Sequence, residues 1–128
     1  MLGSILHLIL HLIIPAVIAL VWSNWAHSRW GGRGLQLYGL MLLTMAVDID
    51  HLLADPIYDP NRCSLGFHPL HTFGPILLYF VLCRWSSMRP IGVGLIVHMI
   101  LDSLDCYRLM GRWSVSYTHL TLPTIYSV

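Results

Sequence analysis

Apolar residues run along this chain in four long stretches separated by short polar segments, and this pattern predicts four helices. The stretches cover residues 4–22, 35–54, 69–85 and 91–107. A helix that crosses a bilayer needs about 17–25 apolar residues, so the first two stretches are long enough and the last two lie at the short limit. Short links favour antiparallel neighbours. The pattern therefore predicts an all-α protein, a four-helix transmembrane bundle with up-down-up-down topology.

Composition favours an integral membrane protein over a soluble one. Hydrophobic residues make up 56% of the chain and charged residues 10%, whereas a soluble domain has about 25% charged residues. The sequence has no lysine and no glutamate, so the usual solvated helix face cannot be built. The five tryptophans fall near predicted helix ends, as an aromatic belt at a membrane surface would place them. We expect membrane lipid as the surroundings and, at a net charge of +1, no nucleic-acid partner.

The four stretches are predicted to form one helical domain over residues 1–114. Residues 115–128 read VSYTHLTLPTIYSV and closely resemble a translated sequencing-adaptor read-through, so we treat them as a non-native tail. The first stretch lacks a basic segment before it and carries two histidines, which predicts a retained helix rather than a cleavable signal peptide. The three cysteines are odd in number and form no CxxC pair, so we expect no disulfide framework. Cys63 is expected to be an ordinary loop cysteine, and Cys83 and Cys106 to be inert.

Histidine and aspartate are concentrated in four short motifs, one for each predicted helix. These motifs are His7-Leu-Ile-Leu-His11, Asp48-Ile-Asp50-His51, His68-Pro-Leu-His71 and His98-Met-Ile-Leu-Asp102. Spacings of three or four residues place both members of a pair on one side of a helix. In an up-down-up-down bundle, all four motifs lie at the same end. Asp50 is the exception, because it reaches inward beside Asp48 only if the helix ends or distorts near Asp48. His27 lies in a polar loop and fits the pattern least well.

This residue set predicts a site for a divalent metal ion. Imidazole and carboxylate groups are costly in an apolar environment unless they are paired or bind a metal. These groups suit zinc first, and they also suit manganese or iron. Their number fits either one ion with supporting residues or two ions. Taken singly, each motif also fits a polar core residue, a cap or a turn. The predicted ligands are His7, His11, Asp48, Asp50, His68, His71 and His98, and the predicted acid-base groups are His51 and Asp102.

The order of the motifs resembles that of the bacterial membrane-bound metal-dependent hydrolase families, over about residues 5–107. By this resemblance, His7 or His11 matches the histidine of the first helix, and His71 matches the second histidine of a His-Arg-Gly-x-Thr-His motif. The DxDH motif is matched by residues 48–51 and the HxxLD motif by residues 98–102. The chain departs from the pattern at Val47, where the families usually have proline, and in its HxxH pair, which lacks Arg-Gly.

The resemblance implies a metal-dependent hydrolase in the bacterial inner (cytoplasmic) membrane, in which activated water attacks an ester or phosphoester of a lipid-like substrate. The alternatives are a non-catalytic metal-binding or transport protein, a haem bundle and a structural membrane protein. Transport predicts polar residues across the whole membrane, and few follow His11 or Thr72. Haem ligation does not need the aspartates. Four arginines lie at the end of the bundle far from the motifs and three at the motif end. Because arginine is more frequent on the cytoplasmic side of a membrane, this count slightly favours a site that faces away from the cytoplasm.

Overall fold

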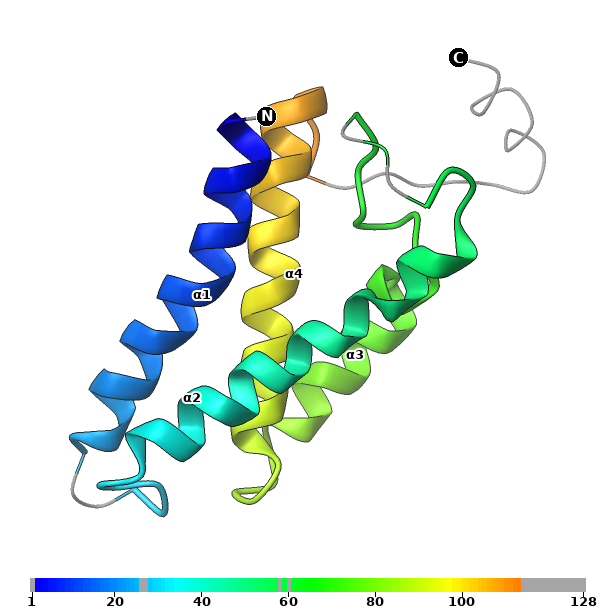
Figure 1. Ribbon diagram of the computed structural model, residues 1–128. Coiled ribbons are helices and arrows are strands. Elements are labelled where there is room, and N and C mark those ends of the chain that lie inside the picture. Colours follow the sequence, from blue (N-terminus) through cyan, green and yellow to red (C-terminus); the bar gives the residue numbers. More distant parts are fainter. Residues whose placement is uncertain (1, 26–27, 58, 60, 114–128) are drawn as a thin grey trace.

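The computed structural model describes residues 2–25, 28–57, 59 and 61–113, and all regular secondary structure in them is helical (Figure 1). His27 and the predicted tail from residue 115 lie outside the described residues. The elements are α1 (Leu2–Ser23), α2 (Gly34–Leu43), the 3-10 helix η1 (Thr44–Leu53), the 3-10 helix η2 (Pro69–His71), α3 (Phe73–Leu82) and α4 (Arg89–Met110). The predicted all-α, four-helix fold is confirmed.

Helix α4 is the centre of the bundle, because it contacts α1, α2 and α3, while α1 also packs on α2. Successive helices run in opposite directions (Figure 1). Two glycines of α4 permit the close packing. A Cβ atom at Gly92 would lie 2.9 Å from the backbone nitrogen of Cys83, and one at Gly94 would lie 3.1 Å from the Cα of Met41. Any larger residue at these positions would push α3 or α2 away from the centre.

The second predicted helix begins as an α-helix and tightens into the 3-10 helix η1 at Thr44. The 3-10 form has three residues per turn, so residues three apart share one face. The buried residues of η1 follow this period, since they are Thr44, Val47 and Asp50. The tighter winding therefore turns Asp50 inward and leaves Asp48 half-exposed. This is the distortion near Asp48 that the DxDH motif required.

The third and fourth helices differ in length from their predicted ranges. Thr72 has extended dihedral angles, φ −95° and ψ 170°, and separates the short η2 from α3. Helix α4 continues to Met110 and ends at Gly111, whose positive φ of 67° is the left-handed conformation typical of a glycine that terminates a helix. These changes leave the four motifs at one end of the bundle.

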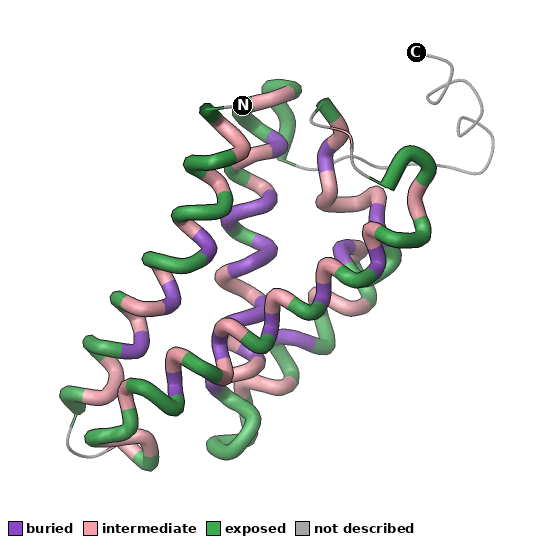
Figure 2. Tube along the Cα trace, viewed as in Figure 1, coloured by how far each residue is buried: buried purple, intermediate pink, exposed green. Residues whose placement is uncertain are grey.

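Many large apolar side chains point away from the bundle. Figure 2 shows exposed positions along the outer side of α1 and buried positions on its inner side. The outward residues of α1 include Ile5, Leu6, Leu8, Ile9, Leu12 and Ile13. Helices α1 and α4 are long and apolar enough to span a membrane, and α3 is a shorter apolar helix.

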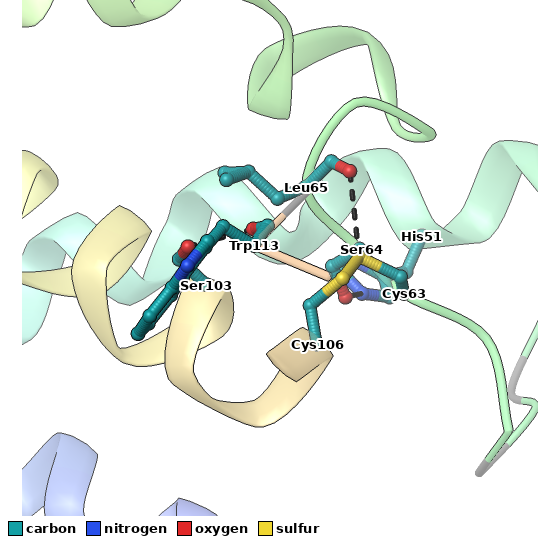
Figure 3. The surroundings of a disulfide bond; sticks show 7 residues. All are labelled: His51, Cys63, Ser64, Leu65, Ser103, Cys106 and Trp113. Carbon is teal, nitrogen blue, oxygen red and sulfur yellow. Dashed lines mark hydrogen bonds between the residues drawn. A yellow bond between two sulfur atoms is a disulfide. The ribbon is translucent and has the colours of Figure 1, made fainter. Parts of the chain in front are cut away.

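The cysteine prediction was wrong, because Cys63 and Cys106 form a disulfide (Figure 3). The loop after η1 folds back over the end of α4, which brings two cysteines 43 residues apart to a Cα–Cα distance of 4.8 Å. An odd cysteine count left Cys83 as the free thiol and did not prevent the other two from pairing. Local spacing carried no signal for a bond that depends on how the loop packs.

Candidate metal centre

Four side chains from three elements converge at the motif end of the bundle. Asp48 comes from η1, His71 from η2, and His98 and Asp102 from α4. The Nε2 atom of His71 lies 3.3 Å from Oδ1 of Asp48 and 3.1 Å from Oδ2 of Asp102. The Nε2 atom of His98 lies 3.1 Å and 3.5 Å from the same two oxygens. One donor atom of each residue thus lies within 4.8 Å of the other three.

These spacings fit a tetrahedral divalent ion. Nitrogen and oxygen ligands lie about 2.0–2.1 Å from zinc, which places two ligands of one tetrahedral ion about 3.3–3.4 Å apart. The four nitrogen–oxygen distances of the cluster range from 3.1 to 3.5 Å. Two imidazoles and two carboxylates are also a donor set that zinc, manganese and iron accept. The residues therefore fit such an ion by both chemistry and spacing.

Burial makes the carboxylates of the cluster costly unless protonated imidazoles or a bound cation balance their charge. His71 is fully buried, and His98 and Asp102 are no more than 5% exposed. Nε2 of His71 and Oδ2 of Asp102 lie 3.1 Å apart and pair when the ring is protonated, but neither atom forms a well-aligned hydrogen bond among the described residues. A buried polar atom left in this way costs about 1–3 kcal/mol. Within the part of the chain described, the one arginine–aspartate ion pair joins Arg108 to Asp105. No arginine there neutralises the cluster.

Asp50 lies behind His71 rather than in the four-residue cluster. Its Oδ2 atom accepts hydrogen bonds from the backbone N–H of Leu70 at 2.8 Å and from Nδ1 of His71 at 3.0 Å. Because a carboxylate accepts, Nδ1 of His71 carries the proton and Nε2 presents its lone pair to the cluster when the ring is neutral. A carboxylate–histidine–metal arrangement of this kind orients a ligand. Asp50, predicted as a ligand, thus contacts the candidate ligand His71, and it also forms a third group with His51 and His68 whose donor atoms lie within 4.8 Å of one another.

His51 and His68 form a stacked pair beside Asp50, with ring centroids 3.7 Å apart. Nδ1 of His51 lies 3.2 Å from Oδ1 of Asp50, and Nε2 lies 3.2 Å from Oγ of Ser64. Burial, reinforced by the neighbouring His51, lowers the pKa of His68 to about 4, so its imidazole is neutral at pH 7. The structure thus places the predicted ligand His68 and the predicted acid-base residue His51 together, outside the four-residue cluster.

The first-helix histidines approach Asp102 from its other side. Nε2 of His7 lies 3.1 Å and Nε2 of His11 lies 3.5 Å from Oδ1 of Asp102. Asp102 therefore faces His71 and His98 with one carboxylate oxygen, and His7 and His11 with the other. The structure brings together all nine residues singled out from the sequence, in three adjoining groups.

A pocket of about 390 Å³ opens beside these groups. Its lining includes His7, Asp48, His51 and Asp102, so the half-exposed carboxylate of Asp48 is reached from this side. The loop before η2 contributes Arg62 and Ser64 to the lining, where Oγ of Ser64 lies 3.2 Å from Nε2 of His51. A ligand in the pocket would meet candidate metal ligands and an imidazole, whereas the guanidinium of Arg62 donates to the backbone oxygens of Pro56 and Ile57.

The disulfide joins the loop that carries Arg62 and Ser64 to α4, the helix that carries the candidate ligands His98 and Asp102. Cys63 lies between Arg62 and Ser64, and Cys106 lies one helical turn after Asp102. Figure 3 shows Ser64 beside the bond and His51 behind it. Sequence reasoning missed Ser64 and the disulfide, because a serine and two distant cysteines carry no periodic signal.

Fold and site together define a class: a helical-bundle protein with a buried histidine–aspartate cluster at one end. The chain belongs to DUF6122, a family of unknown function, whose sequence model matches residues 1–110. Neither the curated proteins nor the solved structures include a significant match to the chain. The matched range contains all nine site residues, and the family supplies no activity to transfer, so function must be argued from the site.

Proposed function

We propose that this protein is an integral membrane protein of the bacterial cytoplasmic membrane that binds a divalent metal ion, zinc first, and hydrolyses an ester or phosphoester of a lipid-like substrate. The observation that carries the proposal is the convergence of Asp48, His71, His98 and Asp102 on one point, with donor distances of 3.1–3.5 Å. The resemblance of the motifs to membrane-bound metal-dependent hydrolases supports the reaction class.

The pocket supports hydrolysis over passive metal storage. A divalent ion at the cluster would lower the pKa of water to around 7 and polarise an ester or phosphoryl oxygen. His51 lines the pocket and is suited to accept a proton from the attacking water and return it to the leaving oxygen. One water is consumed, one ester bond breaks, and an acid and an alcohol leave.

The outward apolar surface supports the membrane location. Exposed leucine and isoleucine side chains cover the outer side of α1, and lipid is the solvent that such a surface fits. The pocket lies at the motif end of the bundle, where α1 begins and α4 ends. An amphiphilic substrate would reach it from the membrane surface without leaving the bilayer.

The first test is metal content per chain, by elemental analysis of detergent-purified protein ending at Ser114. The Asp48→Ala/His98→Ala double variant removes one candidate ligand from η1 and one from α4. The matched control is Asp59→Ala, because Asp59 lines the same pocket but lies outside the cluster. We expect one or two equivalents in the wild type and control, and loss of the cluster ion in the double variant. Circular dichroism and gel filtration would show that each variant is folded.

Metal-loaded protein would then be assayed with chromogenic carboxylic and phosphoric esters and with phospholipid micelles. Turnover that depends on metal and is lost in His51→Gln, with metal content retained, is the expected result. A folded wild type that takes up neither zinc nor manganese would overturn the proposal. Metal uptake without turnover of any ester would leave a metal-binding membrane protein without hydrolase activity.

A further inference from the structure

The carboxylate of Asp102 faces two separate pairs of imidazoles. Its Oδ2 atom lies 3.1 Å from His71 and 3.5 Å from His98, whereas its Oδ1 atom lies 3.1 Å from His7 and 3.5 Å from His11. Asp102 is only 5% exposed, and its Oδ2 atom has no well-aligned hydrogen bond among the described residues. The carboxylate is thus positioned between the histidines of α1 and the pair formed by His71 of η2 and His98 of α4.

In the neutral ring of His11, the lone pair is on Nε2, the nitrogen that faces Asp102. Nδ1 of His11 lies 2.9 Å from the backbone oxygen of His7, and a carbonyl oxygen can only accept, so Nδ1 carries a proton. In the neutral ring, Nε2 is then an acceptor, 3.5 Å from an oxygen of Asp102 that is also an acceptor. Nε2 is buried without a hydrogen-bond partner among the described residues, and His11 is 4% exposed. Two facing buried acceptors are what a cation between them would satisfy.

We propose that His7, His11 and Oδ1 of Asp102 bind a second divalent ion, and that Asp102 bridges it to the ion held by Asp48, His71 and His98. The inference rests on the proposed function and extends it. One donor atom of each of the three residues lies within 4.8 Å of the others. The same two-sided use of a carboxylate occurs when two ions share a site about 3.5–4 Å apart.

The two positions differ in how many protein ligands they have. The cluster around His71 and His98 supplies four, so that water would join it as a fifth ligand, whereas the His7 position supplies three and leaves a tetrahedral place open. His7 is 28% exposed and lines the pocket, so the open place lies on the side from which a ligand enters. The second ion would therefore be the one that meets the substrate.

A two-ion centre with this lining selects the substrate class. Paired ions about 3.5–4 Å apart clamp the attacking and leaving oxygens of a phosphoryl group. The pocket lining also includes Arg62, Asp59 and Asp105, so the positive charge that a substrate meets would come from the paired ions. Two such ions favour a phosphoester anion over a neutral carboxylic ester.

The test is the number of zinc equivalents bound by the chain, measured by competition with a chromophoric chelator. The variant is His7→Gln/His11→Gln, and the control is Asp105→Asn, which lies one turn after Asp102 and pairs with Arg108 at 2.8 Å. We expect two equivalents in the wild type and the control, and one in the double variant. Manganese-loaded wild type should give the electron paramagnetic resonance signal of two coupled ions, and the double variant that of a single ion.

The outcomes separate the two proposals. One equivalent in the wild type, unchanged in the double variant, would overturn the second site and leave the proposed function intact. Two equivalents in a folded His7→Gln/His11→Gln variant would place the second ion elsewhere and also overturn this inference. No binding in the wild type would overturn both proposals. If the double variant does not fold, the wild type still tests the second site. Two bound equivalents with a coupled manganese signal would support it, and one equivalent with an uncoupled signal would overturn it.

Discussion

Asp50 and His71 form a buried pair in which Oδ2 of the carboxylate lies 3.0 Å from Nδ1 of the ring. The opposite nitrogen of the same ring lies 3.3 Å from Asp48 and 3.1 Å from Asp102. Asp50 also accepts the backbone N–H of Leu70 at 2.8 Å, which holds η2 against η1. One carboxylate therefore sets both the ring orientation of His71 and the position of the segment that carries it.

We expect Asp50→Asn to weaken metal binding without abolishing it. Loss of a carboxylate that orients a histidine ligand typically costs about 10–100-fold in metal affinity. The zinc dissociation constant, measured by chelator competition, should rise by that factor while the number of bound ions stays the same. Asp59→Asn, in the same pocket, should leave the constant unchanged. Loss of a whole equivalent in Asp50→Asn would make Asp50 a direct ligand instead.

Metal removal should lower thermal stability. An ion that binds only the folded state stabilises it by about 2.7 kcal/mol when its free concentration is 100 times the dissociation constant. We expect zinc to raise Tm by several degrees and a chelator to reverse the shift, as followed by tryptophan fluorescence in detergent. The Asp48→Ala/His98→Ala variant, which keeps His7, His11 and Asp102, should show a smaller zinc-dependent rise in Tm than the wild type. An equal zinc response in both proteins would mean that the stabilising ion binds elsewhere.

The fold followed from the sequence better than the site did. Helix α1 spans Leu2–Ser23, close to the predicted range 4–22. The prediction succeeded because a long apolar run that ends in polar residues is typical of a single helix. The grouping of the motifs at one end followed from the alternation of helix direction. The contacts of Asp50 could not be predicted from the sequence. They depend on the 3-10 winding of η1 and on the position of the Leu70 backbone N–H, which donates to Asp50. The bond between Cys63 and Cys106 likewise depends on loop packing that no periodic pattern records.

Loss of the disulfide should destabilise the protein and loosen the pocket wall. Cross-linking residues 43 apart removes entropy from the unfolded chain worth about 4 kcal/mol in the chain-entropy model. We expect Cys63→Ser/Cys106→Ser to unfold at a clearly lower denaturant concentration than the wild type. Cys83→Ser is the matched control, because the Cys83 thiol is free. If the double variant and the control unfold at the same midpoint, the bond contributes no net stability.

The disulfide also predicts which side of the membrane the site faces. Disulfides persist in oxidising compartments and are rare in the bacterial cytoplasm, and Cys63–Cys106 lies at the same end as the candidate metal ligands, one turn after Asp102 on α4. The arginines agree in direction, since Arg29, Arg33, Arg84 and Arg89 lie at the far end and three others at the site end. An excess of arginine marks the cytoplasmic side. We therefore expect the pocket to open outside the cytoplasm.

This orientation can be measured by labelling single new cysteines in a Cys83→Ser background, which keeps the disulfide and removes the free thiol. Ile57→Cys lies in the exposed loop at the site end, and Ser86→Cys lies in the exposed turn at the far end. A membrane-impermeant maleimide added to intact spheroplasts should label Ile57→Cys at once and Ser86→Cys only after the membrane is opened. The reverse pattern would place the site in the reducing cytoplasm, where Cys63 and Cys106 would be expected as thiols and the substrate would have to come from the inner leaflet.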